Sequence, residues 1–483
     1  MSLPPAVVVM MLLFPAGDQS ENPWKAKVPA AVQRAERDGS VAAIREAFDV
    51  TWRADDWRAG LTLADLAQQK HPDAPTLLAP AVRALWRGGR IADAERLFAR
   101  LPADTSDLIA LRTGIELNLV RSRFTEVEER ATRLARLKPE SAEDLYAVFA
   151  ARFALNQLDG LPAILRRAEK LSDSAHGYPE MYVQEAIEGL AEFLDAVGTQ
   201  PLNQIAAHGA APMPPLVLLN LPSCEVFING RGPYRMVVDT GGSLTVALDQ
   251  EVAHEIGLKS IASSSVRGVS GKQATGQVLI DELQIGTIKC RRVVTRTFDV
   301  RGAIMNAADG IIGTGIFANG RMTLDFVGGQ LIIAPSGAQP AAGHETELRL
   351  VADSKLIVPV TLEGQPAVAM LDTGADAVAL APTRLTELFP DRPVRKFDTG
   401  LALGVGGEQT PSITVGSGVA LEFAGRKFEN YSGLGLDVLD DVLGPVLGVR
   451  IDILIGMPAF REMKSCTVDF PHGRMWVDWL KGE

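Results

Sequence analysis

Apolar residues follow two different periods along the chain, and the change falls near residue 200. Over residues 23–198 they recur at three- and four-residue spacing among Ala, Leu, Arg and Glu, which predicts amphipathic helices. From residue 216 onward, short runs of Val, Ile and Leu alternate with Gly, Asn and Asp, which predicts an all-β region. Residues 199–215 are rich in Ala, Pro and Gly, as linkers are. We therefore expect a multidomain protein with an all-α first part and an all-β second part.

A repeat with a period near 34 residues runs through the helical region. Segments of similar composition start at Trp57, Ile91, Phe124 and Leu158, so successive starts differ by 34, 33 and 34 residues. Small residues occupy several of the positions where two helices must approach closely. The period resembles that of tetratricopeptide repeats, which implies a concave surface that holds a protein or peptide. A plain helical bundle without a binding role explains the same pattern.

The first 22 residues contain an apolar run from Ala6 to Ala16. This run is too short to span a bilayer, and it has the length of the apolar part of a signal peptide. No Lys or Arg precedes it, and Phe14-Pro15-Ala16 is a poor cleavage site. Two predictions therefore stay open for residues 1–22. They form either a signal peptide of a periplasmic or secreted protein, or a buried apolar arm of a cytoplasmic one.

The composition argues against several classes of function. The net charge of −11 argues against a nucleic-acid surface and against a basic membrane-binding patch. The three cysteines and six histidines are scattered, without the spacing of metal ligands. No GxSxG nucleophile motif and no Walker-type phosphate loop occurs, and no run is long and apolar enough for a transmembrane helix. We therefore predict no metal, no cofactor, no nucleic-acid partner and no transmembrane span.

The tripeptide Asp-Thr-Gly occurs twice in the β region, as Asp239-Thr240-Gly241 and as Asp372-Thr373-Gly374. Each copy follows an apolar run and precedes a turn of small residues. An ionisable Asp after a buried strand is costly unless it is hydrogen-bonded or functional. A single Asp-Thr-Gly is often only a turn, but two copies in similar settings predict a pair of carboxylates that shares one site.

The sequence around the tripeptides is repeated as well. CEVFINGRGPYRMVVDTGGS parallels LIVPVTLEGQPAVAMLDTGAD, and three further blocks match in the same order. The offsets are 133 residues at the Asp, 136 at a Gly-rich turn, 143 at an Ile-Gly pair and 144 at Thr-x-Asp-Phe. This pattern indicates an internal duplication. It predicts two similar lobes, over residues 216–340 and 341–483.

Each copy resembles a retropepsin-like aspartic protease domain. The family pattern is a strand, Asp-Thr-Gly, a hairpin flap with a Gly-rich tip, and an apolar-apolar-Gly turn that supports the catalytic loop. The flap tips that match this pattern are Gly268, Val269, Ser270 and Gly271 in the first copy, and Gly404, Val405, Gly406 and Gly407 in the second. Because the chain carries both copies, the resemblance implies that a monomer is sufficient for a complete site.

The resemblance also implies roles for the residues of the two loops. Asp239 and Asp372 would form a dyad that holds one proton and activates a water molecule. Thr240 and Thr373 would hydrogen-bond across the pseudo-twofold axis. The glycines that follow, Gly241 and Gly374, would let the backbone turn and aim amides at the carboxylates.

Two further positions distinguish the copies. Asp376 matches an acidic residue that holds substrate backbone in retroviral enzymes, whereas the first copy has Ser243 there. The two ends of the groove should therefore differ in substrate preference. Gly242 and Ala375 stand where many pepsin-like enzymes have a hydroxyl residue that lowers the pKa of the catalytic Asp, so we expect a pH optimum of about 4.5–6.5.

The sequence thus predicts an aspartic endopeptidase that hydrolyses peptide bonds in extended protein or peptide substrates. The helical repeats would recruit a protein partner, position the enzyme or cover the groove. The alternative is a catalytically silent peptide-binding or scaffolding protein that keeps the protease fold.

Overall fold

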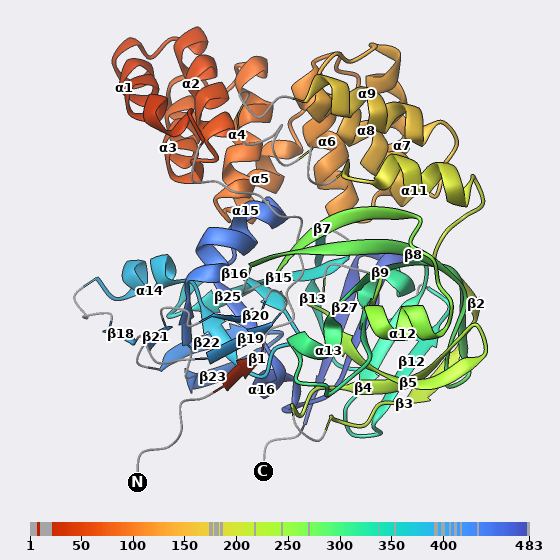
Figure 1. Ribbon diagram of the computed structural model, residues 1–483. Coiled ribbons are helices and arrows are strands. Elements are labelled where there is room, and N and C mark those ends of the chain that lie inside the picture. The colour runs from red at the N-terminus through yellow and green to blue at the C-terminus, as the bar shows by residue number, and fades with distance from the viewer. Residues whose placement is uncertain are drawn as a thin grey trace.

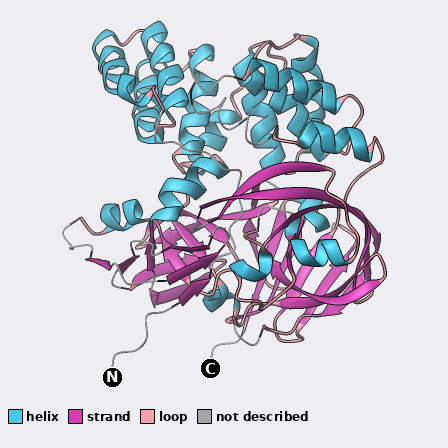
Figure 2. Ribbon diagram, viewed as in Figure 1, coloured by secondary structure: helices cyan, strands magenta, loops and turns pink. Residues whose placement is uncertain are grey.

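A helical region and a β region lie against each other in the computed structural model of the 483-residue chain (Figure 1, Figure 2). The described residues are 7–9, 22–172, 177, 183, 187–216, 219–242, 245–268, 271–337, 339–351, 354–390, 395–397, 401–404, 407–409, 413–415, 418–431 and 434–480.

The helical region consists of antiparallel hairpins that pack side by side. Several of its helices begin at a polar cap, as where the Ser40 hydroxyl accepts a hydrogen bond from the amide of Ala43 at 3.2 Å. The described helices are α1 (Val28–Asp38), α2 (Val41–Ala54), α3 (Trp57–Lys70), α4 (Pro75–Arg87), α5 (Ile91–Phe98), α6 (Leu108–Val120), α7 (Phe124–Arg136), α8 (Ala142–Ala154), α9 (Leu161–Leu171) and α11 (Leu190–Val197).

The repeat segments found in the sequence correspond to the second helix of each hairpin. Helices α3, α5 and α7 begin at Trp57, Ile91 and Phe124, where the first three repeat segments start. The fourth repeat segment starts at Leu158, and α9 begins three residues later, at Leu161. Gly160 directly precedes α9 and has a φ of 71°, a left-handed conformation that glycine adopts readily. The residues before Gly160 therefore form a turn and not part of the helix.

Lobe 1 is built on a sheet of eight described strands in the order β2-β9-β6-β10-β5-β4-β8-β7. Strand β10 runs parallel to β5 and antiparallel to β6, so the end of β5 lies inside the sheet, where its side chains are buried. The strands are β2 (Gln204–Ala207), β4 (Ser223–Ile228), β5 (Arg231–Asp239), β6 (Val246–Asp249), β7 (Ala262–Gly268), β8 (Gly271–Ile285), β9 (Ile288–Phe298) and β10 (Gly310–Gly313).

Lobe 2 repeats this arrangement. Strand β25 runs parallel to β16 and antiparallel to β17, as β10 does with β5 and β6 in lobe 1. Its described strands are β14 (Arg349–Val351), β15 (Lys355–Leu362), β16 (Gln365–Leu371), β17 (Val378–Leu380), β18 (Arg395–Phe397), β21 (Ile413–Val415), β22 (Val419–Phe423), β23 (Arg426–Tyr431), β24 (Leu434–Leu436) and β25 (Ile453–Ile455). The internal duplication in the sequence is therefore also a duplication of topology.

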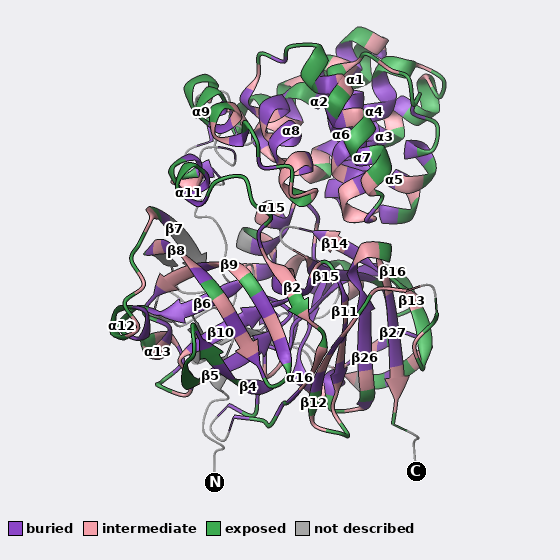
Figure 3. Cartoon of the chain, turned by 90° about the vertical axis from the view of Figure 1, so that its right-hand side faces the viewer, coloured by how far each residue is buried: buried purple, intermediate pink, exposed green. Residues whose placement is uncertain are grey.

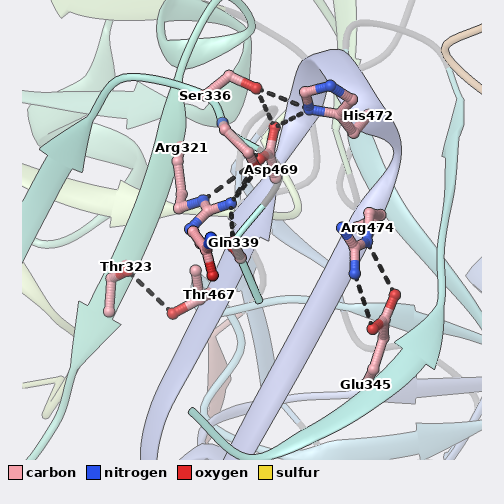
Figure 4. A network of polar contacts seen from close by, with 10 residues as sticks. Arg321, Thr323, Ser336, Gln339, Glu345, Thr467, Asp469, His472 and Arg474 are labelled. Carbon is pink, nitrogen blue, oxygen red and sulfur yellow. Dashed lines mark hydrogen bonds and ion pairs between the residues drawn. The ribbon is translucent and has the colours of Figure 1, made fainter. Parts of the chain in front are cut away.

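A third sheet joins the two lobes. Its order is β13-β27-β26-β11-β12-β3, with β13 (His344–Glu347), β27 (Arg474–Trp479), β26 (Met463–Asp469), β11 (Arg321–Asp325), β12 (Gln330–Ala334) and β3 (Gly209–Pro212). Thr323 of β11 lies opposite Thr467 of β26, and their hydroxyls are 2.9 Å apart (Figure 4). These residues are the two copies of the Thr-x-Asp-Phe block, so the repeated block forms the seam between the lobes.

One residue of this seam, Asp469, is fully buried and collects several partners (Figure 4). Its carboxylate accepts hydrogen bonds from the guanidinium of Arg321 at 2.9 Å, from the Ser336 hydroxyl and from the amide of Gly337 at 3.2 Å, and it lies 3.1 Å from Nδ1 of His472. Burial alone would raise the pKa of Asp469, but these partners together lower it. Asp469 is therefore ionised and ties lobe 2 to lobe 1.

Residues 199–215, predicted as a linker, also take part in the sheets. Strand β2 pairs with β9 of lobe 1, and β3 pairs with β12 of the shared sheet. Near the N-terminus, Val7–Val9 form β1, which runs parallel to β19 (Leu401–Gly404). None of the described helices is long and apolar enough to cross a membrane.

The helical region lies over both lobes (Figure 3). Its contact with lobe 2 is a shared hydrophobic core. Leu447 of α15 (Gly444–Leu447) and Val449 of lobe 2 belong to the same buried cluster as Val82 and Leu85 of α4. On the other side, the backbone before α11 lies against β7, because a Cβ added at Gly189 would stand 2.2 Å from the carbonyl oxygen of Ser263. The helices therefore cover the side of the β region that carries the β7–β8 hairpin.

Candidate active site

The two Asp-Thr-Gly loops follow equivalent strands and are wholly buried. Asp239 is the last residue of β5, and Asp372 directly follows β16. Both aspartates have no exposed surface. Asp239 pairs with Gly313 at the end of β10, and the amide of Asp372 donates a hydrogen bond to the carbonyl of Ile455 at 3.0 Å. The apolar-apolar-Gly turns therefore support both loops.

Four hydrogen bonds between the threonines and the opposite loop join the copies. The amide of Thr240 donates to the hydroxyl of Thr373, and the amide of Thr373 donates to the hydroxyl of Thr240, both at 3.0 Å. The Thr240 hydroxyl donates to the carbonyl of Leu371 at 2.9 Å, and the Thr373 hydroxyl to that of Val238 at 2.7 Å. Because every polar atom in this exchange has its counterpart in the other copy, the loops are fixed in one relative position.

The glycines bring the two carboxyl groups together. A Cβ added at Gly241 would lie 2.3 Å from Cγ of Asp372, and one added at Gly374 would lie 2.5 Å from Cγ of Asp239. Each carboxyl group therefore rests on the glycine of the other loop, at a distance that no residue with a side chain tolerates. The chain segments that carry the two aspartates are 133 residues apart, yet their carboxyl groups share one buried space.

Backbone amides orient the inner oxygen of each carboxyl group. Asp239 Oδ1 accepts from the amides of Gly241 and Gly242 at 2.8 and 2.9 Å, and Asp372 Oδ1 accepts from Gly374 at 2.7 Å. The outer oxygens, Asp239 Oδ2 and Asp372 Oδ2, are buried and receive no hydrogen bond from the part of the chain that the structure describes. Two facing carboxyl groups can satisfy each other only by sharing a proton.

Burial is the main cause of the altered acidity of this pair. It raises the pKa of Asp239 to about 6, against the opposing effect of hydrogen bonds and of the Lys355 charge. Burial also raises the pKa of Asp372 well above its ordinary value, and the negative charge of Asp239 raises it further. Because the two carboxyl groups interact this closely, their apparent pKa values belong to the pair and not to either residue.

Two segments of the chain match the family model described as aspartyl protease, residues 224–316 and 358–459. Each segment contains one of the Asp-Thr-Gly loops. Both lobes of the β region are therefore similar to aspartyl proteases over the segment that carries the Asp-Thr-Gly loop. A search of solved structures returned the crystal structure of a retropepsin-like aspartic protease from Rickettsia conorii. It is 16% identical, the match covers 26% of this chain and 90% of that chain, and the TM-score is 0.19. No curated protein matches the chain.

Both predicted flaps lie at the ends of β-hairpins in the protease lobes. Gly268 of β7 pairs with Gly271 of β8, and Gly404 of β19 pairs with Gly407 of β20 (Gly407–Gln409). The tip residues between them, Val269, Ser270, Val405 and Gly406, lie outside the described residues, and so does Ser243. Asp376 is half-buried four residues after Asp372.

A cavity of about 570 Å³ lies between the helical region and the two protease lobes. On the helical side it is lined by α2, α4, α6 and α8, the first helices of successive hairpins, with the aromatic side chains Trp52, Trp86, Tyr146 and Phe149. On the side of the β region it reaches Thr245, which follows the first Asp-Thr-Gly loop, and Lys355, which begins β15. The inner face of the helical repeats is therefore turned toward the protease lobes.

Lys355 was not predicted from the sequence as a site residue. It is fully buried, although it carries a charge, and its charge acts on Asp239. Aligning the two copies reveals it: the equivalent residue of lobe 1 is Leu221, also fully buried. A comparison of the two copies could have found Lys355, because it replaces a leucine at the equivalent position.

Proposed function

We propose that this protein is an aspartic endopeptidase that cleaves extended polypeptides with a single active site built from both lobes. The observation that carries the proposal is the placement of each aspartate against the glycine of the other loop, with the threonine hydrogen bonds between them. This arrangement confines two carboxyl groups and one proton in a buried space, which is what peptide hydrolysis by an activated water requires.

The reaction needs one ionised and one protonated carboxyl group. The ionised aspartate takes a proton from water as the water oxygen bonds to the carbonyl carbon of the peptide, while the neutral aspartate gives its proton to the carbonyl oxygen. When the resulting tetrahedral diol collapses, the C–N bond breaks, the amine leaves with the proton taken from water, and a diol hydroxyl returns a proton to the second aspartate. The raised pKa values of Asp239 and Asp372 support this division of roles at mildly acidic pH and above.

The helical region, in this proposal, contributes a wall of the substrate site. Its aromatic side chains line the cavity whose other side reaches Thr245, four residues after Gly241. A substrate chain that leaves the dyad toward this cavity would contact the helices, so recruitment of substrate is the role that the geometry supports best. Removing the helices is a poor test of this role, since the cut would expose the core that α4 shares with lobe 2.

The experiment that tests the activity compares wild type with Asp239→Asn and Asp372→Asn on an unfolded protein substrate between about pH 3 and 8. Each substitution keeps the shape of the side chain and removes the shared proton chemistry, so we expect cleavage to fall by at least about 10³-fold. Asp325→Asn is the matched control: Asp325 Oδ1 accepts a hydrogen bond from the Gly328 amide in a surface turn, and an amide oxygen can do the same. Absence of cleavage by wild type at every pH would favour the silent peptide-binding alternative.

The location of the protein is a separate prediction. An N-terminal signal would direct it to the periplasm or out of the cell, whereas pairing of Val7–Val9 with β19 is the behaviour of an apolar arm that stays on the protein. Determining the N-terminal residue of the protein purified from its own cell distinguishes the two.

A further inference from the structure

Lys355 is a buried charged side chain at a position where lobe 1 has the apolar Leu221. It is fully buried at the start of β15, and its neighbours along the strand, Leu356, Ile357 and Val358, are apolar and buried as well. Burying a lysine ammonium is costly unless a negative group compensates it. The buried charge of Lys355 is therefore expected to interact with a negative group close to it.

The strand register places this lysine beside the dyad. Leu356 pairs with Leu371, the residue before Asp372, so Lys355 lies opposite Asp372 at the end of the β15–β16 ladder. In lobe 1 the same ladder places Leu221 opposite Asp239, because Ser223 pairs with Val237. The duplication thus offers two equivalent positions next to the two aspartates, and only the one in lobe 2 carries a charge.

A contact between the lobes holds the backbone before Lys355 close to the strand that supports Asp239. The hydroxyl of Thr314 donates a hydrogen bond to the carbonyl of Ser354 at 2.8 Å. Thr314 directly follows Gly313, which pairs with Asp239, and Ser354 directly precedes Lys355. Ser354 has a φ of 73°, a left-handed conformation that is costly for a residue with a side chain and persists only where its surroundings enforce it. The backbone before Lys355 is therefore held against the support of the first catalytic loop.

We propose that Lys355 is a positioning residue that assigns the negative charge of the dyad to Asp239. Asp239 then takes the proton from water, and Asp372 holds the proton that passes to the carbonyl oxygen. This inference rests on the proposed function and deepens it, because it names a group outside the two Asp-Thr-Gly tripeptides that decides which aspartate is ionised. The charge of Lys355 acts in the direction that the assignment needs, since it lowers the pKa of Asp239.

Other charged groups near Lys355 come from the helices and from lobe 1. The same cavity is lined by Arg83 and Arg87 of α4, Glu116 of α6, Glu143 of α8 and Arg296 of β9. Arg83 pairs with Glu143 and lies 3.7 Å from Glu116, and Arg87 pairs with Asp55. The α4 cations are thus compensated by carboxylates of the helical region.

The first test is the pH dependence of kcat/KM for wild type, Lys355→Met and Lys355→Arg. Loss of the charge should raise the lower apparent pKa of the dyad, so the acid limb of the Lys355→Met profile should move up by about one pH unit. At pH values below the acid limb of the Lys355→Met profile, kcat of this variant should be about tenfold lower than that of wild type, while KM for an uncharged peptide stays unchanged. The arginine variant should keep the wild-type limb, and Leu221→Met should not move it. An unmoved limb in a folded Lys355→Met protein overturns the proposal.

The second test requires no turnover and assigns the charge to one aspartate. Protein labelled with ¹³C at the aspartate carboxyl carbons is titrated by NMR in Asp372→Asn, where Asp239 remains, and in Asp239→Asn, where Asp372 remains. Adding Lys355→Met should raise the pKa of Asp239 by about one unit or more and that of Asp372 by less. An equal or larger change at Asp372 contradicts the assignment even if the enzyme is active. A protein that cuts nothing but shows the expected change would refute the proposed function and leave the electrostatic role of Lys355 in place.

Discussion

Lobe 1 and lobe 2 exchange the same hydrogen bonds at the centre of the molecule, but their surroundings differ. Thr240 and Thr373 make equivalent contacts, and each glycine of the tripeptides lies under the opposite carboxyl group. Away from this centre, lobe 2 shares a buried core with the helices, whereas lobe 1 meets them through partly buried residues such as Leu279 of β8 and Val294 of β9. A duplicated fold therefore keeps its symmetry where the two aspartates must meet, and loses it where the chain binds other parts of itself.

The largest expected effect tests the symmetric centre. Gly241→Ala and Gly374→Ala each place a methyl group within 2.3 and 2.5 Å of the opposite carboxyl carbon. Both variants should lose at least about 100-fold in cleavage, because a displacement of the carboxyl groups of this size disrupts their geometry. Each should also lose about 1–3 kcal/mol of stability through overpacking.

Gly337→Ala is the matched control for these variants, since a Cβ there meets nothing within 4 Å and the amide that binds Asp469 is retained. Cleavage assays and thermal unfolding give the comparison. If one of the two catalytic-loop variants stays active and the other does not, the centre is not symmetric in the way that the hydrogen bonds indicate.

The centre of the site was also the part that the sequence predicted best. Asp-Thr-Gly and its repeated flanks are local patterns with a fixed physical meaning: a strand, a tight turn and a carboxylate held by backbone amides. The two hairpins of the predicted flaps follow from Gly-rich turns between alternating strands in the same way. These features depend on neighbours along the chain, and a sequence shows such neighbours directly.

Features that depend on distant partners were predicted less well. The segment 199–215 has the composition of a linker, but β9 and β12 lie alongside it and offer free strand edges, so two short strands form. The residues next to Lys355 in the sequence do not mark it as a site residue, because its proposed role depends on Asp239 in the other lobe. The sequence indicated helical repeats, yet nothing in their periodicity indicates that their inner face is turned toward the protease.

The second prediction concerns the seam, where the duplicated Thr-x-Asp-Phe aspartates have diverged. Asp469 binds Arg321, Ser336 and Gly337, whereas Asp325 caps a turn by accepting a hydrogen bond from the Gly328 amide. Asp469→Asn should therefore cost about 2–3 kcal/mol, because it leaves the Arg321 guanidinium without its carboxylate. Asp325→Asn should cost about 0.5 kcal/mol or less.

The effect of Asp469→Asn should also depend on pH. The pKa of Asp469 is lowered in the folded protein, so its contribution is present above the unfolded value of about 3.9 and is lost as the pH falls through the folded value. Urea denaturation should show a clear difference between the variant and wild type at pH 6, and a smaller one near pH 3. A difference that stays constant over this range would mean that the charge of Asp469 is not what joins the lobes.

The smallest expected effect tests whether the helices are fixed more firmly to lobe 2 than to lobe 1. Arg349 of β14 pairs with Glu95 of α5 at 2.6 Å, and both side chains are largely buried. On the other side, Gln277 of lobe 1 donates to the carbonyl of Glu188 at 3.3 Å, which is a long hydrogen bond. Arg349→Leu should lower the free energy of unfolding by about 1 kcal/mol, a moderate loss because Glu95 keeps its ion pair with Arg121. Gln277→Ala should lower it by about 0.5 kcal/mol.

Hydrogen exchange measures the same difference locally. Amides of α5 and α15 should exchange more slowly than those of α11 in wild type, since the core shared with lobe 2 contains buried residues of both regions, whereas α11 packs on residues of lobe 1 that are only partly buried. Arg349→Leu should speed exchange in α5, and Gln277→Ala should act only near α11 and β7. Equal protection of α5 and α11 would mean that the helices bind both lobes equally. The helical wall would then be a rigid part of the whole site rather than an extension of lobe 2.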